Sequence, residues 1–227
     1  MIKITIAGSH GKMGKSIIAL AEKDKDIKIV SKFDVGTDAL AEIKKCDILI
    51  EFTAPEATME HVAIAQRLKK GVVIGTTGLS QEDNDLIKKA SKEIPIVISP
   101  NMSVGVNLLF KMCQDAARTL PKEYKVSIYE VHHIHKKDSP SGTAKRLRDV
   151  IGSERKMFAG EIPIEAIREG EVVGDHKVVF DSETETIELF HSAKSRDTFA
   201  AGAIKAAKFL DGKKSGLYSM RDVLGIG

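Results

Sequence analysis

The chain has 227 residues, of which 42% are hydrophobic and 30% are charged, a composition that excludes disordered and fibrous proteins. This length suits one large domain or two modest ones, and a core of that size needs no disulfide or metal to fold. The formal net charge is only +3, from 35 basic and 32 acidic side chains, and the basic residues are spread along the chain, so no nucleic-acid partner is expected.

The N-terminal segment and the cysteines predict a soluble protein of the cytoplasm. Residues 1–7 lead straight into a glycine cluster and lack the apolar stretch and cleavage site of a signal peptide. No apolar run approaches the roughly 20 residues of a membrane helix, so no membrane partner is expected. The two cysteines, Cys46 and Cys113, are far apart and form no CxxC motif, which is typical of reduced thiols in a reducing compartment.

Strands and helices alternate through the first half of the chain. Short β-branched or apolar runs predict strands at residues 2–6, 27–33, 46–52, 72–74 and 96–99. Helical spacing of apolar residues predicts the intervening helices at residues 15–23, 38–45, 55–69 and 80–92. Such alternation with short connections is typical of a parallel sheet that is covered by helices on both faces.

A different pattern follows and predicts a second domain. We expect helices at residues 104–120, 141–151 and 199–210, and strands at residues 126–131, 175–180 and 186–191. The last two strands have no helix between them, which is typical of a mixed or antiparallel sheet. The sequence therefore predicts an α/β protein with a parallel sheet in residues 1–102 and a second α+β domain, built on a mixed sheet, in residues 103–199, with residues 200–227 packing back on the first domain.

The turn between the first strand and the first helix is rich in glycine, and reads Gly8-Ser9-His10-Gly11-Lys12-Met13-Gly14. Glycines at this spacing allow a sharp turn, let the backbone approach a pyrophosphate, and let the helix pack closely on the strand. The helix N-terminus then offers free N–H groups to the phosphates. The sequence thus predicts a Rossmann-like domain that binds a nicotinamide dinucleotide through Gly8, Ser9, His10, Gly11, Lys12 and Met13.

An acidic residue stands where such a site needs one. Asp34 ends the second strand about 20 residues beyond Gly14, so its carboxylate is predicted to accept the ribose hydroxyls of NAD. The next residue is Val35 rather than the Arg that accommodates a 2′-phosphate, although Lys12 or Lys32 could still admit NADP. The expected cofactor is therefore NADH, NADPH or both.

Two further loops follow the fourth and fifth predicted strands. In an open α/β sheet, ligands bind outside the carboxyl ends of the strands, so both loops should face the cofactor. The residues expected to contact it there are Gly75, Thr76, Thr77, Ser99, Pro100, Asn101 and Met102.

The densest polar stretch is EVHHIHKKDSPSGT, residues 130–143, between a strand and a helix. Its three histidines within four residues raise the possibility of zinc, which needs three or four converging ligands. Neighbouring residues of a strand point to opposite faces, so His132 and His133 cannot easily share one metal, and no Cys or second His cluster completes a set nearby. We therefore expect no metal.

These residues instead suit proton transfer and anion binding. His132 or His133 can exchange a proton near neutral pH. Lys136 can supply positive charge and a proton. Ser141 is predicted to cap a helix whose first N–H groups, those of residues 142 and 143, suit a carboxylate.

The chain resembles the 4-hydroxy-tetrahydrodipicolinate reductase (dihydrodipicolinate reductase) family along nearly its whole length. The most specific signal is the pattern E-x-H-H-x-x-K-x-D-x-P-S-G-T-A, which the chain matches from Glu130 to Ala144. Other matching segments are the glycine turn and residues 51–56, 75–78, 101–107, 170–176 and 199–203.

This resemblance implies an NAD(P)H-dependent oxidoreductase of the diaminopimelate route of lysine biosynthesis. Its substrate would be a small cyclic dicarboxylate, 4-hydroxy-tetrahydrodipicolinate, which is reduced to tetrahydrodipicolinate. By resemblance, His132 would be the catalytic proton donor or acceptor and Lys136 the proton donor to the substrate. The substrate carboxylates would be held by His133, Gly142 and Thr143. The family also implies a homotetramer assembled through the sheet of the second domain.

Some features depart from the family pattern. The chain is short for the family, with the missing residues expected between Ile151 and Ile167, and Lys12 and Val35 stand where Arg is common. Two alternatives stay open, namely another NAD(P)-dependent reductase, such as an amino-acid or sugar dehydrogenase, and a dinucleotide sensor without catalysis. The carboxylate-binding pattern at residues 141–143 argues against the first alternative, and Lys136 argues against the second.

Overall fold

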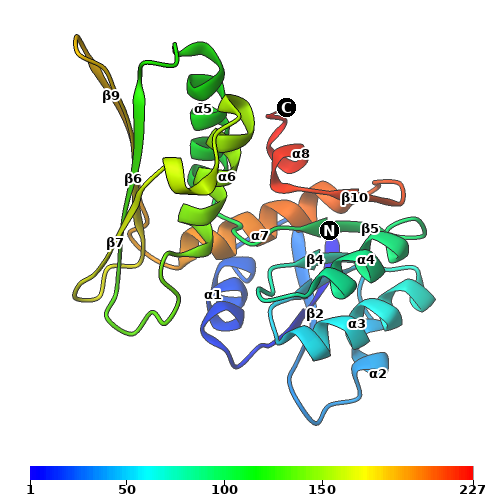
Figure 1. Cartoon of the computed structure of the whole chain (residues 1–227). Helices are drawn as coiled ribbons and strands as arrows, with labels where there is room; N and C mark the ends of the chain where they lie inside the picture. The colour runs from blue at the N-terminus through cyan, green and yellow to red at the C-terminus, as the bar shows by residue number, and fades with distance from the viewer. Residues whose placement is uncertain (227) are drawn as a thin grey trace. The chain divides into compact units, whose positions relative to one another are not determined.

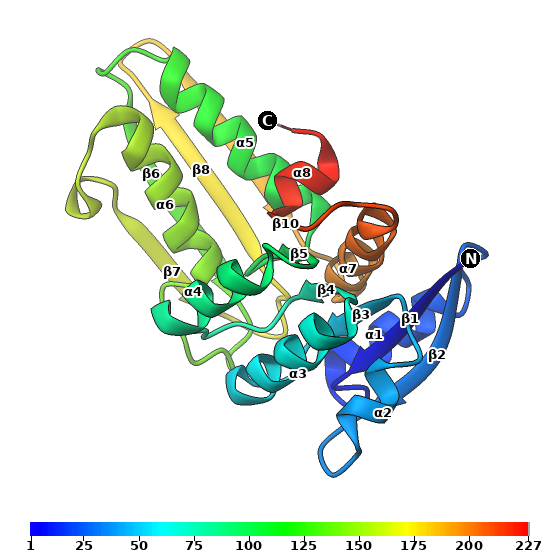
Figure 2. The same ribbon diagram turned by 90° about the vertical axis from the view of Figure 1, so that its right-hand side faces the viewer.

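The computed structural model describes residues 1–226 and divides the chain into two compact units (Figures 1 and 2). The first unit contains residues 1–104 and 197–227, and the second contains residues 105–196. The predicted domain boundaries lie a few residues away from these limits, since the helix expected from residue 199 begins at Asp197. The assignment of a cofactor to one part and a substrate to the other stays a prediction.

The first unit is built on a six-stranded parallel sheet in the order β10-β5-β4-β3-β1-β2. The strands are β1 (Ile2–Ala7), β2 (Ile27–Phe33), β3 (Ile48–Glu51), β4 (Gly71–Ile74), β5 (Pro95–Ile98) and β10 (Gly216–Tyr218). All five strands predicted for this sheet are present. The sixth, β10, was not predicted, because three residues are too few to show a strand period.

Helices cover both faces of this sheet, as predicted. One face carries α1 (Lys12–Ala21), α7 (Asp197–Leu210) and α8 (Met220–Leu224), and the other carries α2 (Ala39–Ile43), α3 (Pro55–Leu68) and α4 (Gln81–Ala90). The side chains of β3 alternate between the two cores, with Ile48 and Ile50 in the first and Leu49 in the second. Each such buried aliphatic side chain contributes roughly 1.5–3 kcal/mol, so both faces stabilise the sheet.

The second unit is built on a four-stranded mixed sheet in the order β7-β6-β8-β9. Its strands are β6 (Lys125–His132), β7 (Ile164–Arg168), β8 (Asp175–Asp181) and β9 (Thr186–Ser192). Strands β6 and β7 are parallel, and the other pairs are antiparallel. The predicted fold class, a parallel sheet followed by an α+β domain on a mixed sheet, is therefore confirmed.

Two helices, α5 (Val104–Thr119) and α6 (Gly142–Arg155), lie on one face of this mixed sheet and complete its core (Figure 2). Helix α6 is longer than predicted, because it continues through Gly152 and ends at Lys156 in the left-handed conformation. The connection from α6 to β7 is short and contains only the 3-10 turn η1 (Ala159–Glu161). None of the helices in residues 1–226 combines the length and hydropathy that crossing a membrane requires.

Candidate functional site

The predicted dinucleotide turn of the first unit depends on two glycines that no other residue could replace. Gly8 has a φ of 79°, and a Cβ at this position would lie 2.4 Å from the carbonyl oxygen of Phe52. A Cβ at Gly14 would lie 2.1 Å from the carbonyl oxygen of Gly8. Helix α1 begins just after Gly11 without a side-chain cap, so its first backbone N–H groups suit an anion. These observations fit a pyrophosphate at the turn.

Asp34 ties the end of β2 to this turn. Its Oδ2 atom accepts hydrogen bonds from Ser9 Oγ at 2.8 Å and from the His10 backbone N–H at 2.7 Å. Its Oδ1 atom has no hydrogen-bond partner within residues 1–226, and the side chain is 28% exposed. The carboxylate is thus fixed in place and keeps one oxygen for a ligand such as a ribose hydroxyl.

The other predicted cofactor residues lie at the same edge of the sheet, because they follow the carboxyl ends of β4 and β5. Gly75 packs on the ring of Phe52, where a Cβ would come within 2.1 Å of Cζ. Thr76 is buried, and its Oγ1 accepts a hydrogen bond from Thr58 Oγ1 at 2.8 Å. The loop after β5 is held by a 2.7 Å hydrogen bond from Ser99 Oγ to the Asn101 carbonyl.

A buried pair of polar residues supports these loops and was not predicted as a functional element. Glu51 at the end of β3 is fully buried, and its Oε2 atom lies 2.6 Å from His61 Nδ1 on α3. Its other oxygen accepts a hydrogen bond from the Thr53 backbone N–H at 2.9 Å and lies 3.4 Å from Thr58 Oγ1. The available signal was an acidic residue inside the apolar run C-D-I-L-I-E-F.

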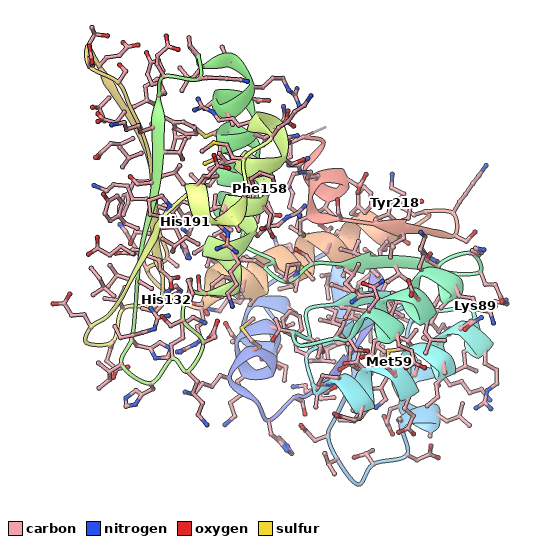
Figure 3. All side chains as sticks on the ribbon, viewed as in Figure 1. Met59, Lys89, His132, Phe158, His191 and Tyr218 are labelled. Atoms are coloured by element: carbon pink, nitrogen blue, oxygen red, sulfur yellow. The ribbon has the colours of Figure 1, made fainter. Side chains whose placement is uncertain are left out.

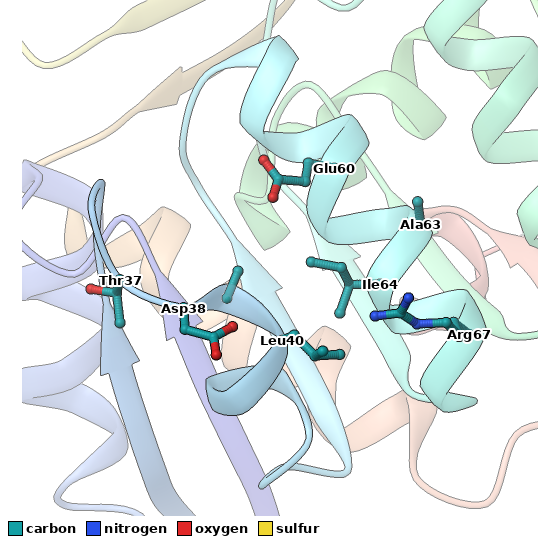
Figure 4. A pocket seen from close by; sticks show the side chains of 8 residues that line it. Thr37, Asp38, Leu40, Glu60, Ala63, Ile64 and Arg67 are labelled. Carbon is teal, nitrogen blue, oxygen red and sulfur yellow. The ribbon is translucent and has the colours of Figure 1, made fainter.

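A pocket of about 480 Å³ lies between α2 and α3 (Figure 4). It is lined by residues 37–40 together with Glu60, Ala63, Ile64 and Arg67. None of these is a predicted site residue, and the lining groups show no arrangement typical of catalysis.

In the second unit, the alternation of β6 places polar groups on the buried face of the sheet. Val126, Ile128, Glu130 and His132 are all buried, whereas the residues between them are partly exposed. His132 is thus the last residue of the strand and faces the same side as the core (Figure 3). Cross-strand register adds two partners, because His176 on β8 pairs with Glu130, and Arg168 on β7 pairs with His132. Neither partner was predicted.

Glu130 is the centre of this cluster. Its Oε1 atom accepts hydrogen bonds from the Ser141 backbone N–H at 2.9 Å and from the Arg168 guanidinium at 3.1 Å. Its Oε2 atom lies 3.2 Å from His132 Nδ1 and 3.8 Å from His176 Nε2. Burial acts to raise the pKa of Glu130, but the adjoining His132, Ser141 and Arg168 outweigh it and hold that pKa well below the usual range. The carboxylate is therefore ionised.

His176 is held neutral beside this charge. Burial, followed by the charge of His132, lowers the pKa of His176 to about 3. Its ring packs edge-on against that of His132 with centroids 5.1 Å apart, and its Nε2 atom lies 3.3 Å from Ser141 Oγ. His176 thus fills the space beside His132 without adding a charge.

Glu130, His132 and His176 bring three metal-ligand atoms within 4.8 Å of one another. No Cys or second His cluster was expected nearby, and the structure adds one further histidine, His176, from β8. However, the guanidinium of Arg168 already neutralises the carboxylate. A divalent cation would stand next to this positive charge, so we interpret the cluster as a network of hydrogen bonds and ion pairs.

The loop after β6 adds positive charge close to this cluster. Lys136 Nζ donates a 2.7 Å hydrogen bond to Asp138 Oδ1, and its charge contributes to lowering the pKa of His176. His133 is half-buried, and its pKa is lowered by burial and by the charge of Arg196. The positive charges of Lys136 and Arg196 suit an anionic ligand.

The start of α6 lies beside the same groups. Ser141 caps the helix, as predicted, by accepting a 3.1 Å hydrogen bond from the Ala144 N–H. A Cβ on Gly142 would meet no atom within 4 Å, so the space beside this residue is open. Ser141 is also hydrogen-bonded to Glu130 through its backbone, which joins the predicted carboxylate site to the histidine cluster.

Replacing His176 should reduce the loss of stability that the protein suffers at acidic pH. The pKa of His176 is about 3 in the folded protein against 6.5 for an ordinary histidine, so between these values the unfolded chain binds a proton and the folded protein does not. Its contribution is therefore nil above 6.5 and becomes destabilising as pH falls, on the order of 2 kcal/mol at about pH 5. In urea titrations at pH near 7 and near 5, His176→Gln should lose less free energy of unfolding than the wild type, and an equal loss would contradict neutral burial.

Comparisons with known proteins extend over the whole chain. The family model for the N-terminus of dihydrodipicolinate reductase matches residues 2–102 of the chain, and the model for its C-terminus matches residues 105–224. The chain is 39% identical to the 4-hydroxy-tetrahydrodipicolinate reductase of Nitrosomonas europaea over 99% of this chain and 98% of that protein. It is 41% identical to the protein of the same name from Aquifex aeolicus over 99% of each chain. The alignment with the Nitrosomonas protein runs over 264 residues, so that relative carries residues that this shorter chain lacks.

A solved structure shows the same fold. Dipicolinate-bound dihydrodipicolinate reductase from Paenisporosarcina sp. TG-14 superposes with a TM-score of 0.85 at 22% identity, over 98% of both chains. A probable dehydrogenase from Thermotoga maritima is more distant, with a TM-score of 0.67 at 13% identity over 99% of this chain and 93% of that chain. The predicted family, enzyme class and cofactor type are confirmed by these matches. The chain belongs to the dihydrodipicolinate reductase family, whose members are NAD(P)H-dependent oxidoreductases of diaminopimelate and lysine biosynthesis.

Proposed function

We propose that the cluster around His132 binds and protonates a cyclic dicarboxylate, and that the glycine turn holds NADH or NADPH, in the reduction of 4-hydroxy-tetrahydrodipicolinate to tetrahydrodipicolinate. The single observation that supports these roles best is the second unit's cluster itself. It places a buried imidazole in close contact with an ionised carboxylate, and that carboxylate accepts a hydrogen bond from the N-terminus of α6. A second unit that served only as a structural support would have no need of such a network.

The cofactor role of the first unit rests on the fit of its residues. Residues 8–13 supply the turn and helix start for the pyrophosphate, Asp34 offers one carboxylate oxygen to a ribose, and residues 75–77 and 99–102 border the same edge. Reduced nicotinamide, when bound, supplies the hydride. With Val35 after Asp34, no Arg stands at the 2′-phosphate position, so we propose that NADH is accepted and that NADPH binding depends on Lys12 or Lys32.

The second unit would bind the substrate through its carboxylates. The N–H groups of Gly142 and Thr143 at the start of α6, together with the imidazole of His133, would hold them. Positive charge from Lys136 and Arg168 lies close to this cluster and lowers the energy of an anionic ligand.

Proton delivery completes the reduction. The 4-hydroxyl group leaves as water, one carbon of the resulting double bond accepts the hydride, and its neighbour must accept a proton. Lys136 is the proposed donor of that proton, and His132 the proposed donor or acceptor that exchanges protons at the site.

A coupled assay tests the reaction. Pyruvate and aspartate semialdehyde would be condensed by the synthase that makes the substrate, and the loss of reduced-nicotinamide absorbance would be followed with NADH and NADPH separately. Oxidation that requires both the synthase and this protein supports the proposal. Absence of oxidation, despite measured NADH binding, would overturn the substrate assignment and leave the dinucleotide fold in place.

Replacing Lys136 should lower turnover without weakening the binding of the cofactor. Removal of a general acid costs about 10²–10⁴ in rate, so Lys136→Ala should show a kcat reduced by about that factor with an unchanged Kd for NADH. Lys137→Ala is the matched control, because Lys137 is the next residue and is exposed. Equal kcat values for the two variants would remove Lys136 from the chemistry.

Replacing Asp34 should weaken the binding of NADH more than the binding of NADPH. Asp34→Ala removes the ribose acceptor, and it also frees Ser9 and the His10 backbone, so both cofactors should bind less tightly. Only the NADH complex has an unmodified 2′-hydroxyl to lose, so its Kd should rise further, by about tenfold for a bond of roughly 1.4 kcal/mol. Fluorescence titration with each cofactor measures this, and equal losses would refute the ribose role.

We also propose a cytoplasmic homotetramer, as the family resemblance implies. Both cysteines are free and buried, which suits a reducing compartment. The helices of residues 105–196 cover one face of the mixed sheet, and the opposite face exposes Phe190 and Ile167 near Tyr129. An apolar sheet face of this kind suits contact with other copies of the chain.

Charge on that face should disrupt assembly. Phe190 is 63% exposed on β9, so Phe190→Glu should leave the fold intact and shift the mass measured by light scattering from a tetramer to a smaller species. Phe158→Glu is the matched control, because Phe158 is 82% exposed but precedes η1, away from the sheet. A tetramer that persists in the Phe190 variant would locate the interface elsewhere.

A further inference from the structure

The mechanism proposed above gives no role to the buried carboxylate of Glu130. Glu130 is 1% exposed, and its Oε2 atom has no hydrogen-bond partner within residues 1–226. The polar atom that faces it most closely is His132 Nδ1 at 3.2 Å, and neither atom has a hydrogen bond within residues 1–226, so the two form a close contact between a carboxylate oxygen and an imidazole nitrogen. His176 Nε2 is farther away, at 3.8 Å, and contacts Ser141 Oγ instead.

This pairing determines which nitrogen of His132 carries the proton. An ionised carboxylate only accepts hydrogen bonds, so the Nδ1 atom that faces it must be the protonated nitrogen. In a neutral imidazole, Nε2 is then the acceptor, and it is the atom left to exchange a proton with a ligand. The low pKa of Glu130 means that this arrangement holds throughout the neutral pH range.

The environment of Nε2 explains a glycine that the backbone does not require. A Cβ at position 174 would lie 2.9 Å from His132 Nε2 and 3.2 Å from its Cδ2 atom. Gly174 does not have a positive φ, so its conformation is open to other residues. The steric reason for glycine is therefore the imidazole, because any side chain at position 174 would displace the ring or cover Nε2.

We propose that Glu130 and Gly174 are positioning residues for His132, Glu130 by holding Nδ1–H and Gly174 by leaving Nε2 uncovered for proton exchange. The proposal rests on the function proposed above for His132. Glu130 also accepts the Ser141 backbone N–H at the start of α6. One carboxylate thus orients the imidazole and, at the same time, the helix start that is proposed to bind the substrate.

Several charged groups surround this imidazole. Arg168 on β7 and Lys136 in the loop after β6 are cationic, and His133 stands next to His132 in the chain. His176 on β8 is neutral and adds no charge. Ser141 on the α6 side contributes only dipoles. Glu130 is therefore the anionic group that faces the imidazole of His132.

Glu130→Gln tests the proposal, since it removes the charge and keeps the shape. In the coupled assay we expect kcat to fall about 100-fold and the KM for NADH to stay unchanged. In a His132→Gln background the same change should have little further effect on kcat, because the residues act as a unit. An equal fall in both backgrounds would show that Glu130 acts only on the fold and would overturn the proposal.

Gly174→Ala provides a second test that removes no functional group. Moving a reacting atom by about 1 Å costs about 10²-fold in rate, so kcat should fall by that factor while the thermal midpoint stays near that of the wild type. Gly160→Ala is the matched control, because a Cβ there would meet no atom within 4 Å. Wild-type turnover in Gly174→Ala would overturn the steric role. This variant also decides the proposal if Glu130→Gln fails to fold.

A readout independent of activity separates this proposal from the proposed function. Nitrogen-15 NMR of the imidazole distinguishes the two neutral tautomers directly, in the folded protein without substrate. We expect His132 to carry its proton on Nδ1 in the wild type and a mixture of tautomers in Glu130→Gln. A proton on Nε2 in the wild type would overturn the proposal, whereas failure of the coupled assay with the expected tautomer would overturn only the proposed function.

Discussion

A carboxylate that is buried at the end of a strand must be compensated, and Glu130 imposes this constraint on the second unit. Its compensation comes from three chain segments, namely Arg168 on β7, the Ser141 backbone at the start of α6, and His132 on the same strand. Removing one partner from such a buried set typically costs about 3–5 kcal/mol, because a charge is then left unpaired. The end of the mixed sheet and the start of α6 are therefore held together by electrostatics as well as by the apolar packing of Ala144 and Leu147.

The first unit uses the same device at the end of β3. Glu51 is fully buried, pairs with His61 on α3, and accepts the backbone N–H of Thr53. Through Thr58 this network reaches Thr76, one of the predicted cofactor residues. In each unit a buried glutamate at the carboxyl end of a strand fixes the loops that carry the binding residues. The apolar cores provide stability, and these two carboxylates provide the positions of the loops.

The sequence predicted those parts of the structure that depend on local pattern. Buried parallel strands are continuous apolar runs, so β1 to β5 were apparent, and the glycine turn and Asp34 were expected together because their spacing is fixed by one βαβ unit. Helix α1 begins at Lys12, earlier than predicted, because its start is set by the glycine turn and not by the first apolar residues. Strand β7 was missed, since it has only five residues, IEAIR, which are too few to show a clear strand period.

Contacts that depend on register between distant strands were beyond the reach of sequence patterns. His176 and Arg168 join His132 because β8 and β7 pair with β6, and nothing local marks either residue. The same limit applies to Gly174, whose importance arises from a side chain more than forty residues earlier in the chain. The loops of the first unit all follow the carboxyl ends of parallel strands, so their proximity could be predicted without knowing the register between the strands.

The first unit is assembled from two stretches of chain that the whole second unit separates. Helix α7 belongs to the later stretch, yet Ala203 and Ala207 lie in the same core as Ile4 and Ile50. During synthesis, residues 1–104 leave the ribosome long before α7 exists, so one apolar face of the parallel sheet has no cover at that stage. Residues 105–196, in contrast, contain all of their own core. The segment made second is therefore able to fold first, and the N-terminal strands are completed last, after a period in which their bare face is a natural target for chaperones.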